Sequence, residues 1–287
     1  MEQFHGTTIV SVRRKTPSGD QVAIGGESEL GRAVRQTNVD REQLLMLDDF
    51  YLALSASYGE TGDRVARILL LLESVAIGNP GVHASVVDGV LRRYIEEDLQ
   101  GGGDSPFRVP RFLQNDIARY WRTMAVDFAH KRRERSGSGW ALRTAKLRLS
   151  RKLIYATGLL NCFSCKYELP PERYPDALTA TERVVTHLAG LVRKTPLDIV
   201  ARTVLLFFGE LSGPARDLFG AYDEFLRFLD DESNREHLER LRSDRAPADR
   251  VYEDVRLLGE RFQQALTTMF FDSKTPISDL TKRYGVF

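Results

Sequence analysis

Apolar residues recur every three to four positions along most of this 287-residue chain, and this helical period constrains the fold more than any other feature. Because 3.6 residues complete a helical turn, such spacing is typical of helices with one buried side. The period begins near Asp40 and continues to the C-terminus. The sequence therefore predicts a mainly α fold, a multi-helix bundle. Its clearest stripe, within 110–135, is formed by Leu113, Ile117, Trp121, Met124, Ala125 and Phe128.

A second long helix is predicted immediately after the first, over 140–160. The connector Ser136–Gly139 is short, so the two helices are expected to pack antiparallel. The inward side of the second helix is predicted to be Leu142, Ala145, Leu149, Leu153 and Ala156.

Glycine- and proline-rich breaks separate the other predicted helices. The run Val204–Phe208 is apolar on every side, and we expect it in the central core. The predicted ranges are 40–54, 63–77, 82–99, 179–192, 196–208, 214–229, 234–241 and 247–271, with a final turn at 276–284.

The first 26 residues have a different pattern. The run Thr7–Val12 is rich in β-branched residues, Thr16–Asp20 has turn composition, and Gln21–Ile24 is a candidate returning strand before Gly25 and Gly26. This pattern predicts a short N-terminal β-hairpin. We therefore expect a hairpin segment at 1–26 and a helical domain at 27–287.

Positive charge is concentrated in the predicted helix pair, although the whole chain has a formal net charge of only +1. Between Arg108 and Lys152 there are thirteen arginines and lysines against three acidic residues, whereas Glu210–Asp272 leans acidic. Such a pair, interspersed with aromatic residues, is a candidate phosphate-binding surface. The alternatives are solvated faces, or docking on the acidic C-terminal helices. The candidate ligand-binding residues are Arg119, Arg122, Arg143, Lys146, Arg151 and Lys152.

Polar residues also cluster on the first helix of the pair, beside its apolar stripe. At helical spacing they form two neighbouring faces, which predicts either a buried polar network or the lining of a pocket. The first face carries Asn115, Arg119 and Arg122, and the second carries Asp116, Tyr120, Thr123 and Asp127.

The two cysteines lie in one C-x-x-C run, Cys162 to Cys165. They are too few for a disulfide scaffold, and structural thiols, half of a metal site and a redox pair are the three interpretations. The start of the chain lacks a secretory pattern, and the longest apolar runs are far shorter than a membrane span. We therefore expect a cytoplasmic protein without a membrane partner.

The helical region resembles the C-terminal part of bacterial predicted nucleotidyltransferase-like proteins. The resemblance covers about residues 40–287. One matching block is Arg111–Thr123, with the sequence RFLQNDIARYWRT, and its most specific part is Asn115–Thr123. The other matching blocks are Ile68–Ser74, Val126–Phe128, Trp140–Arg143, Lys146–Lys152, Ala221–Asp223, Leu229–Asp231 and Arg283–Phe287.

Members of that family carry an N-terminal catalytic domain in which a Gly-Ser turn holds a triphosphate and two carboxylates, separated by one residue, hold divalent metal. The first 60 residues here contain no such pattern, and Asp48 and Asp49 are adjacent. The resemblance thus implies a helical module whose catalytic domain is truncated or replaced. Its expected partner is a nucleotide, a nucleic acid or a protein. No cofactor is identified, and Mg²⁺ is expected only if a nucleotidyltransferase site survives in degenerate form.

A second resemblance covers the N-terminus. Residues His5–Arg14 and Val22–Gly26 are similar to the start of the HslV family of proteasome-like bacterial peptidases. In that family a leader is removed and the first threonine becomes the nucleophile, with its α-amino group as base. The matching residue is Thr7, and a threonine peptidase of an ATP-dependent protease is therefore an alternative function. The match ends near Gly26, and no lysine lies between Lys15 and Lys131.

Overall fold

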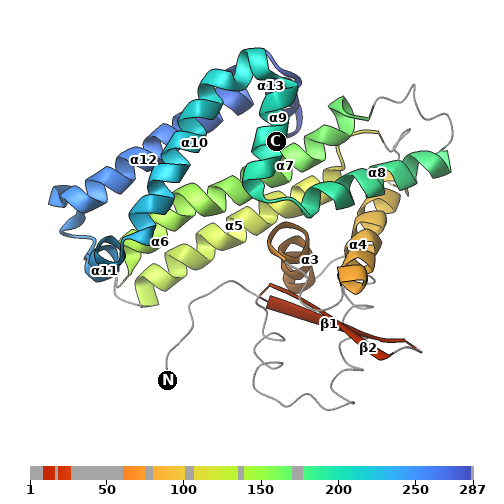
Figure 1. The fold of residues 1–287 in the computed structure, drawn as a ribbon, viewed down its shortest axis with the longest axis horizontal. Coiled ribbons are helices and arrows are strands. Elements are labelled where there is room, and N and C mark those ends of the chain that lie inside the picture. The colour runs from red at the N-terminus through yellow and green to blue at the C-terminus, as the bar shows by residue number, and fades with distance from the viewer. Residues whose placement is uncertain are drawn as a thin grey trace. The chain divides into compact units, whose positions relative to one another are not determined.

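The computed structural model describes residues 9–16, 19–26, 61–74, 80–100, 107–134, 139–169 and 177–285. Helices dominate this part of the chain, so the mainly α prediction is confirmed (Figure 1). The predicted helix at 40–54 lies outside the described residues. The chain divides into two compact units, the first drawn from Met1–Tyr120 and Ser164–Lys194 and the second from Trp121–Phe163 and Thr195–Phe287. The predicted division at residue 26 stays a prediction.

Strands β1 (Ile9–Thr16) and β2 (Gly19–Gly26) pair antiparallel, with Ile9 opposite Gly26 and Thr16 opposite Gly19 (Figure 1). An isolated pair of strands needs an apolar face packed on another element to be stable in water. Because the strand side chains are not described, no such face is assigned, and a stable N-terminal hairpin stays a prediction.

The first unit is built on α4 (Pro80–Gln100) and α8 (Ala177–Val192), which pack together. Their shared side is rich in buried valine and leucine, and the ion pair between Arg92 and Glu182 joins the helices at its edge. This unit also contains α3 (Thr61–Glu73), the start of α5 (Arg111–Glu134) and the end of α7 (Lys152–Tyr167).

The second unit contains an antiparallel pair formed by α10 (Phe208–Asp230) and α12 (Arg250–Thr267) (Figure 1). The rings of Tyr222 and Phe262 meet between them, with centroids 5.9 Å apart. The remaining elements of this unit are the end of α5, α6 (Trp140–Lys146), η1 (Leu147–Arg151), most of α7, α9 (Pro196–Leu206), α11 (Glu232–Arg240), η3 (Ala246–Ala248), η4 (Thr268–Asp272), α13 (Pro276–Leu280) and η5 (Thr281–Gly285).

The start of α10 differs from the predicted helix at 214–229. The helix begins at Phe208 and includes Pro214 in its interior. Proline removes one backbone donor and usually marks a boundary. Here the turn before it is nonetheless helical, and Leu211 in that turn is fully buried. Packing of Leu211 in the core offsets the cost of the proline.

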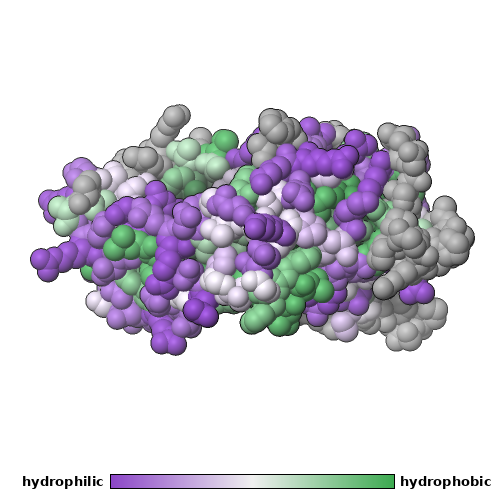
Figure 2. Space-filling model, turned by 90° about the horizontal axis from the view of Figure 1, so that it is seen from above, coloured by the Kyte–Doolittle hydropathy of each residue, from purple (hydrophilic) through white to green (hydrophobic). Residues whose placement is uncertain are grey.

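The predicted core run Val204–Phe208 is wrong for most of its members. Val204 is buried, but Leu205, Leu206 and Phe208 are 74%, 49% and 62% exposed. The chain turns from α9 into α10 at Phe207, where φ is −124° and ψ is 39°, so the run lies at a corner instead of inside a helix. Figure 2 shows hydrophobic surface where α9 and α10 meet. A run of apolar residues in the sequence does not indicate that the chain turns a corner there.

No helix of the described part is long and apolar enough to cross a membrane.

Candidate functional site

A buried polar network occupies the first unit, on the early turns of α5. Asp116 is 4% exposed and accepts a hydrogen bond of 2.9 Å from the Tyr94 hydroxyl. Tyr120, one turn later, donates to Glu73. The guanidinium of Arg67 lies over the Tyr94 ring, 5.6 Å from its centroid. Because a buried polar group is costly without a partner, these contacts fix the packing of α3, α4 and α5. Of the four residues of this predicted face, Asp116 and Tyr120 belong to a buried network, whereas Thr123 and Asp127 are exposed.

Arg119 belongs to the first unit and faces this network. Its Nη1 lies 4.0 Å from Asp116 Oδ1, and its side chain is 49% exposed. The positive charge of Arg119 is therefore partly compensated by a carboxylate. Among the six predicted ligand-binding residues, Arg119 thus differs in having a carboxylate within reach.

Asp98, near the end of α4, supports the N-terminus of α5. Its Oδ2 accepts a hydrogen bond of 2.8 Å from the backbone N–H of Arg111, and the Arg108 guanidinium lies 3.9 Å from its Oδ1. A carboxylate is favourable at a helix N-terminus, where backbone N–H groups lack partners. Burial raises the pKa of Asp98, against the opposing effect of the Arg111 N–H. This contact anchors the start of the helix that carries the network.

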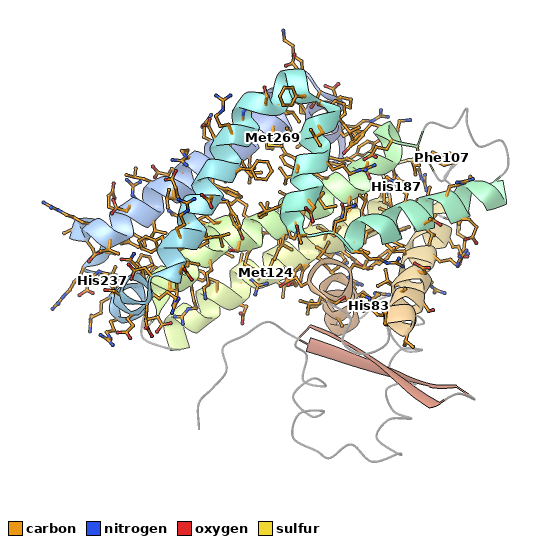
Figure 3. All side chains as sticks on the ribbon, in the orientation of Figure 1. His83, Phe107, Met124, His187, His237 and Met269 are labelled. Atoms are coloured by element: carbon orange, nitrogen blue, oxygen red, sulfur yellow. The ribbon has the colours of Figure 1, made fainter. Side chains whose placement is uncertain are left out.

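A serine–histidine pair also lies in the first unit. Ser164 Oγ is 2.7 Å from His187 Nε2, which links the end of α7 to α8 (Figure 3). This is the geometry that activates a serine nucleophile in hydrolases. However, Ser164 is only 2% exposed, so a substrate has no access to its hydroxyl. The pair is a structural link between two helices.

In the second unit, α6, η1 and α7 follow one another without a break, and the middle segment is a π-helical turn. All five residues predicted to face inward, namely Leu142, Ala145, Leu149, Leu153 and Ala156, are buried. The end of α5 runs antiparallel to this helix, as the short connector predicted (Figure 1). The π turn adds a residue to the local repeat, and such turns are frequent at functional sites. Several of the candidate cations lie on or next to it.

Arg148 and Lys152 lie about one turn apart at the junction of η1 and α7. Lys152 Nζ donates a hydrogen bond of 2.5 Å to Gln263 Oε1 of α12. Gly259 brings α12 close to Arg148, since a Cβ at this glycine would lie 3.8 Å from the Arg148 Cβ. Burial lowers the pKa of Lys152, and the positive charge of Arg148 lowers it further. Arg148 was not among the six predicted residues. It lies four residues before Lys152, and this spacing could have predicted that the two side chains are neighbours on the helix.

An aromatic pair adjoins these cations. The rings of Trp121 and Tyr155 stack, with centroids 5.5 Å apart and planes 21° apart. Both side chains are half-buried. Burial raises the pKa of Tyr155, and the positive charge of the exposed Arg122 opposes that rise. Tyr155 follows Lys152 by three residues on α7, which places the two side chains on neighbouring positions of one face. Arg122, Arg148 and Lys152 are called the basic cluster below.

Within the described residues, no member of the basic cluster forms an ion pair. Several carboxylates of the C-terminal region pair instead with arginines from that same region. The second helix of the basic pair does contact α12, through the hydrogen bond from Lys152 to Gln263 and the approach of Gly259 to Arg148, but without an ion pair from the basic cluster among the described residues. The observed pairs are Asp223–Arg227, Glu224–Arg261, Glu236–Arg240, Asp244–Arg242, and Arg256 with both Glu253 and Glu260.

The other predicted cations have varied surroundings. Lys146 is exposed at the end of α6, and Arg151 is half-buried in η1. Arg143 is half-buried beside Gly139, whose φ of 62° favours glycine and whose N–H donates to the Glu239 carbonyl oxygen at 2.9 Å. A Cβ at Gly139 would lie 3.1 Å from Arg143 Nη1.

Cys162 and Cys165 are free thiols, and both are fully buried. Burial raises the pKa of the Cys165 thiol. A buried, protonated thiol is a poor nucleophile and metal ligand, which favours the structural interpretation. Among the described side chains, no group of three or more His, Cys, Asp or Glu could hold a metal ion.

No family model and no solved structure matches this chain. The residues on which the two catalytic alternatives depend, Thr7 for peptidase activity and Asp48 with Asp49 for nucleotidyl transfer, lie outside the described residues. Both alternatives stay predictions of the sequence.

Proposed function

We propose that the second unit binds an anionic ligand, the phosphate groups of a nucleotide or nucleic acid, at the basic cluster and without catalysing transfer. In this proposal the chain is the helical module of a nucleotidyltransferase-like protein, as the sequence resemblance implies, and a cytoplasmic location belongs to the same proposal. The N-terminal hairpin is treated as a separate segment. The observation that carries the proposal is that Arg148 and Lys152 lie next to each other and neither is paired with a carboxylate among the described residues.

Two neighbouring positive charges without a counter-charge raise the local electrostatic potential. Lys152 is also partly removed from water, which makes its charge costly and lowers its pKa. A phosphate oxygen would neutralise this charge and accept hydrogen bonds from both side chains. An arginine in an internal ion pair already has its charge compensated. Arg256 and Arg261 are each paired with a carboxylate and are therefore not part of the proposed site.

The stacked rings of Trp121 and Tyr155 favour a nucleotide over a simple inorganic anion. Aromatic side chains beside a cationic surface are the usual support for nucleobases, and each base stacked on a ring contributes about 1–3 kcal/mol. Arg122 lies close enough to Tyr155 to affect its pKa, so positive charge and aromatic surface adjoin. We expect phosphate groups at Arg148 and Lys152 and a base near Tyr155.

Binding of a fluorescent single-stranded oligonucleotide tests the proposal, with a length of about 12 nucleotides as in small single-strand binding folds. Lys152→Gln and Arg148→Gln should each weaken binding by about tenfold, since a hydrogen bond to a charged group contributes about 1.5 kcal/mol or more. The matched control is Arg242→Gln in the same unit, whose side chain is 74% exposed and pairs with Asp244. It should leave the affinity unchanged.

Competition with ATP and with inorganic phosphate separates the ligand classes. ATP should displace the oligonucleotide at lower concentration than phosphate, because only ATP offers a base to the aromatic pair. Affinity should also fall with salt concentration, with a smaller slope in the Lys152→Gln variant. Absence of binding at low salt, or equal loss in the Arg242→Gln control, would contradict the proposal and leave a protein partner as the alternative.

A further inference from the structure

A shallow hollow of about 600 Å³ lies on the antiparallel pair α10 and α12, within the second unit. Phe228, Leu257 and Leu258 supply its apolar lining. Leu257 is 49% exposed. Figure 2 shows hydrophobic surface enclosed by hydrophilic residues over these two helices.

This hollow is not the core-facing side of the helices. The core side of α12 carries Val255, Phe262 and Leu266, and that of α10 carries Leu218 and Phe225, all of them buried. The pair therefore has apolar residues on two sides, only one of which is covered.

The charged residues around the hollow are balanced in sign. Glu224 and Arg261 pair with each other across the two helices, with Arg261 Nη2 2.7 Å from Glu224 Oε1. Among the described residues, Arg227 pairs with Asp223 of its own helix, and its side chain is 79% exposed. Asp254 is exposed and forms no hydrogen bond or ion pair among the described residues. Exposed pairs such as Arg227–Asp223 contribute little and exchange partners at little cost.

We propose that this face binds a second copy of the chain through a two-fold interface. A two-fold interface joins the same surface of each copy, so the surface must complement itself. Here the apolar lining of one copy meets that of the other, while Arg227 of each copy meets Asp254 of its mate. A nucleic acid or a strongly charged protein would require a face with net charge, and this one has two carboxylates and two guanidinium groups.

The size of the face is below that of a standard stable interface. At 1.5 Å per residue and about 10 Å per helix width, helices of this length present roughly 500–700 Å² on one side. A stable interface buries about 800 Å² per partner, and smaller ones are weaker and reversible. The expected product is therefore a dimer that dissociates on dilution. This inference does not depend on anion binding at the basic cluster.

Sedimentation equilibrium of the full chain over a range of concentrations tests the proposal. The wild type should form a reversible dimer, and Leu257→Glu should weaken it at least tenfold, because a charge is brought against the apolar lining. Leu205→Glu is the matched control, since Leu205 is exposed outside this face. It should dimerise like the wild type. Circular dichroism checks that each variant is folded.

A charge exchange identifies the surface directly. Asp254→Arg and Arg227→Asp should each weaken the dimer about tenfold, because like charges then face each other. The double variant should recover most of the wild-type affinity, since the pair is restored with reversed polarity. A wild type that stays monomeric, a Leu257→Glu variant that dimerises normally, or a double variant no better than the single ones would overturn the proposal.

Discussion

The buried network of the first unit and the basic cluster of the second use the same kinds of residues in opposite ways. Both combine arginine with tyrosine on α5 and its neighbours. In the network, Asp116 accepts from Tyr94 and lies near Arg119, and Glu73 accepts from Tyr120. In the cluster, the cations face an aromatic pair and an amide, with no carboxylate paired to them among the described residues.

The difference shows that the arginine and tyrosine content of a helix does not reveal its role. What separates the two regions is the number of carboxylates within reach. Where carboxylates are present, polar residues hold helices together, and their loss should cost stability. Where they are absent, the cations should be dispensable for folding and required for binding.

Removal of the central carboxylate of the network should have the largest effect. Asp116→Ala leaves the Tyr94 hydroxyl without its acceptor in a buried site and removes the counter-charge of Arg119. We expect a loss of about 3 kcal/mol in the free energy of unfolding, measured by urea denaturation. The control Asp230→Ala changes an exposed residue and should cost less than about 0.5 kcal/mol. Equal effects of the two changes would contradict the network.

Replacing a tyrosine by phenylalanine should lower the free energy of unfolding more in the first unit than in the second. Tyr94→Phe removes a hydrogen bond to a buried carboxylate and should cost about 1.5–2 kcal/mol in unfolding free energy. Tyr222→Phe in the second unit removes a half-buried contact of 3.2 Å to the Ser150 hydroxyl and should cost about 0.5 kcal/mol. If Tyr222→Phe cost more than Tyr94→Phe, the assignment of the network to stability would be wrong.

The carboxylate of Asp249, in the second unit, stabilises the fold, and its contribution to the free energy of unfolding should depend on pH. Asp249 accepts from the Tyr252 N–H at the start of α12 and lies 2.7 Å from Nε2 of His237 on α11 (Figure 3). Burial alone would raise the pKa of Asp249, but these hydrogen bonds outweigh it and hold the pKa below its ordinary value. Its contribution to stability is therefore present above the ordinary pKa of about 3.9 and is lost as pH falls through the lower folded-state pKa.

Urea denaturation between about pH 2 and pH 6 measures this effect. Asp249→Ala should cost about 1 kcal/mol near pH 6, the usual contribution of a helix N-cap. Asp249→Asn keeps an acceptor for the cap but cannot titrate, so its stability should fall less steeply with acid than that of the wild type. The same acid dependence in both proteins would exclude Asp249 as the source.

The smallest effect on stability is expected in the basic cluster. Arg148→Gln relieves the repulsion of Lys152 and should change the unfolding free energy by less than about 0.5 kcal/mol, in either direction. The same variant is expected to weaken oligonucleotide binding about tenfold. A loss of stability above about 1 kcal/mol would place Arg148 with the structural residues, beside those of the network.

Helical periodicity was sufficient to predict most of the described fold. The inward residues of the α6–α7 helix, Leu149 and Leu153 among them, were identified from spacing alone because a long amphipathic helix has one possible core side. Spacing failed at Leu205 and Phe208, because a corner between two helices exposes residues that a continuous helix would bury. It also failed at Pro214, where tertiary packing outweighed a local helix breaker.

The site was predicted less completely than the fold. The sequence identified the positive segment and included Arg122 and Lys152, but it grouped Arg119 with them and left out Arg148. Asp116 lies three residues before Arg119, so their pairing could be predicted from the sequence. The lack of an ion pair at Arg148 among the described residues could not, because it depends on how the acidic residues of α10 and α12 pair with one another's arginines. Charge compensation between distant helices is a property of the fold and not of local spacing.

The most direct test of the unpaired cluster is the pKa of the Lys152 ammonium group, measured by NMR of labelled lysine side chains. Without ligand, the pKa of Lys152 should lie below that of an exposed lysine, because of burial and of Arg148. Addition of the oligonucleotide should raise it, and Arg148→Gln should raise it in the free protein. A pKa of Lys152 that stays the same on addition of saturating oligonucleotide would contradict the account.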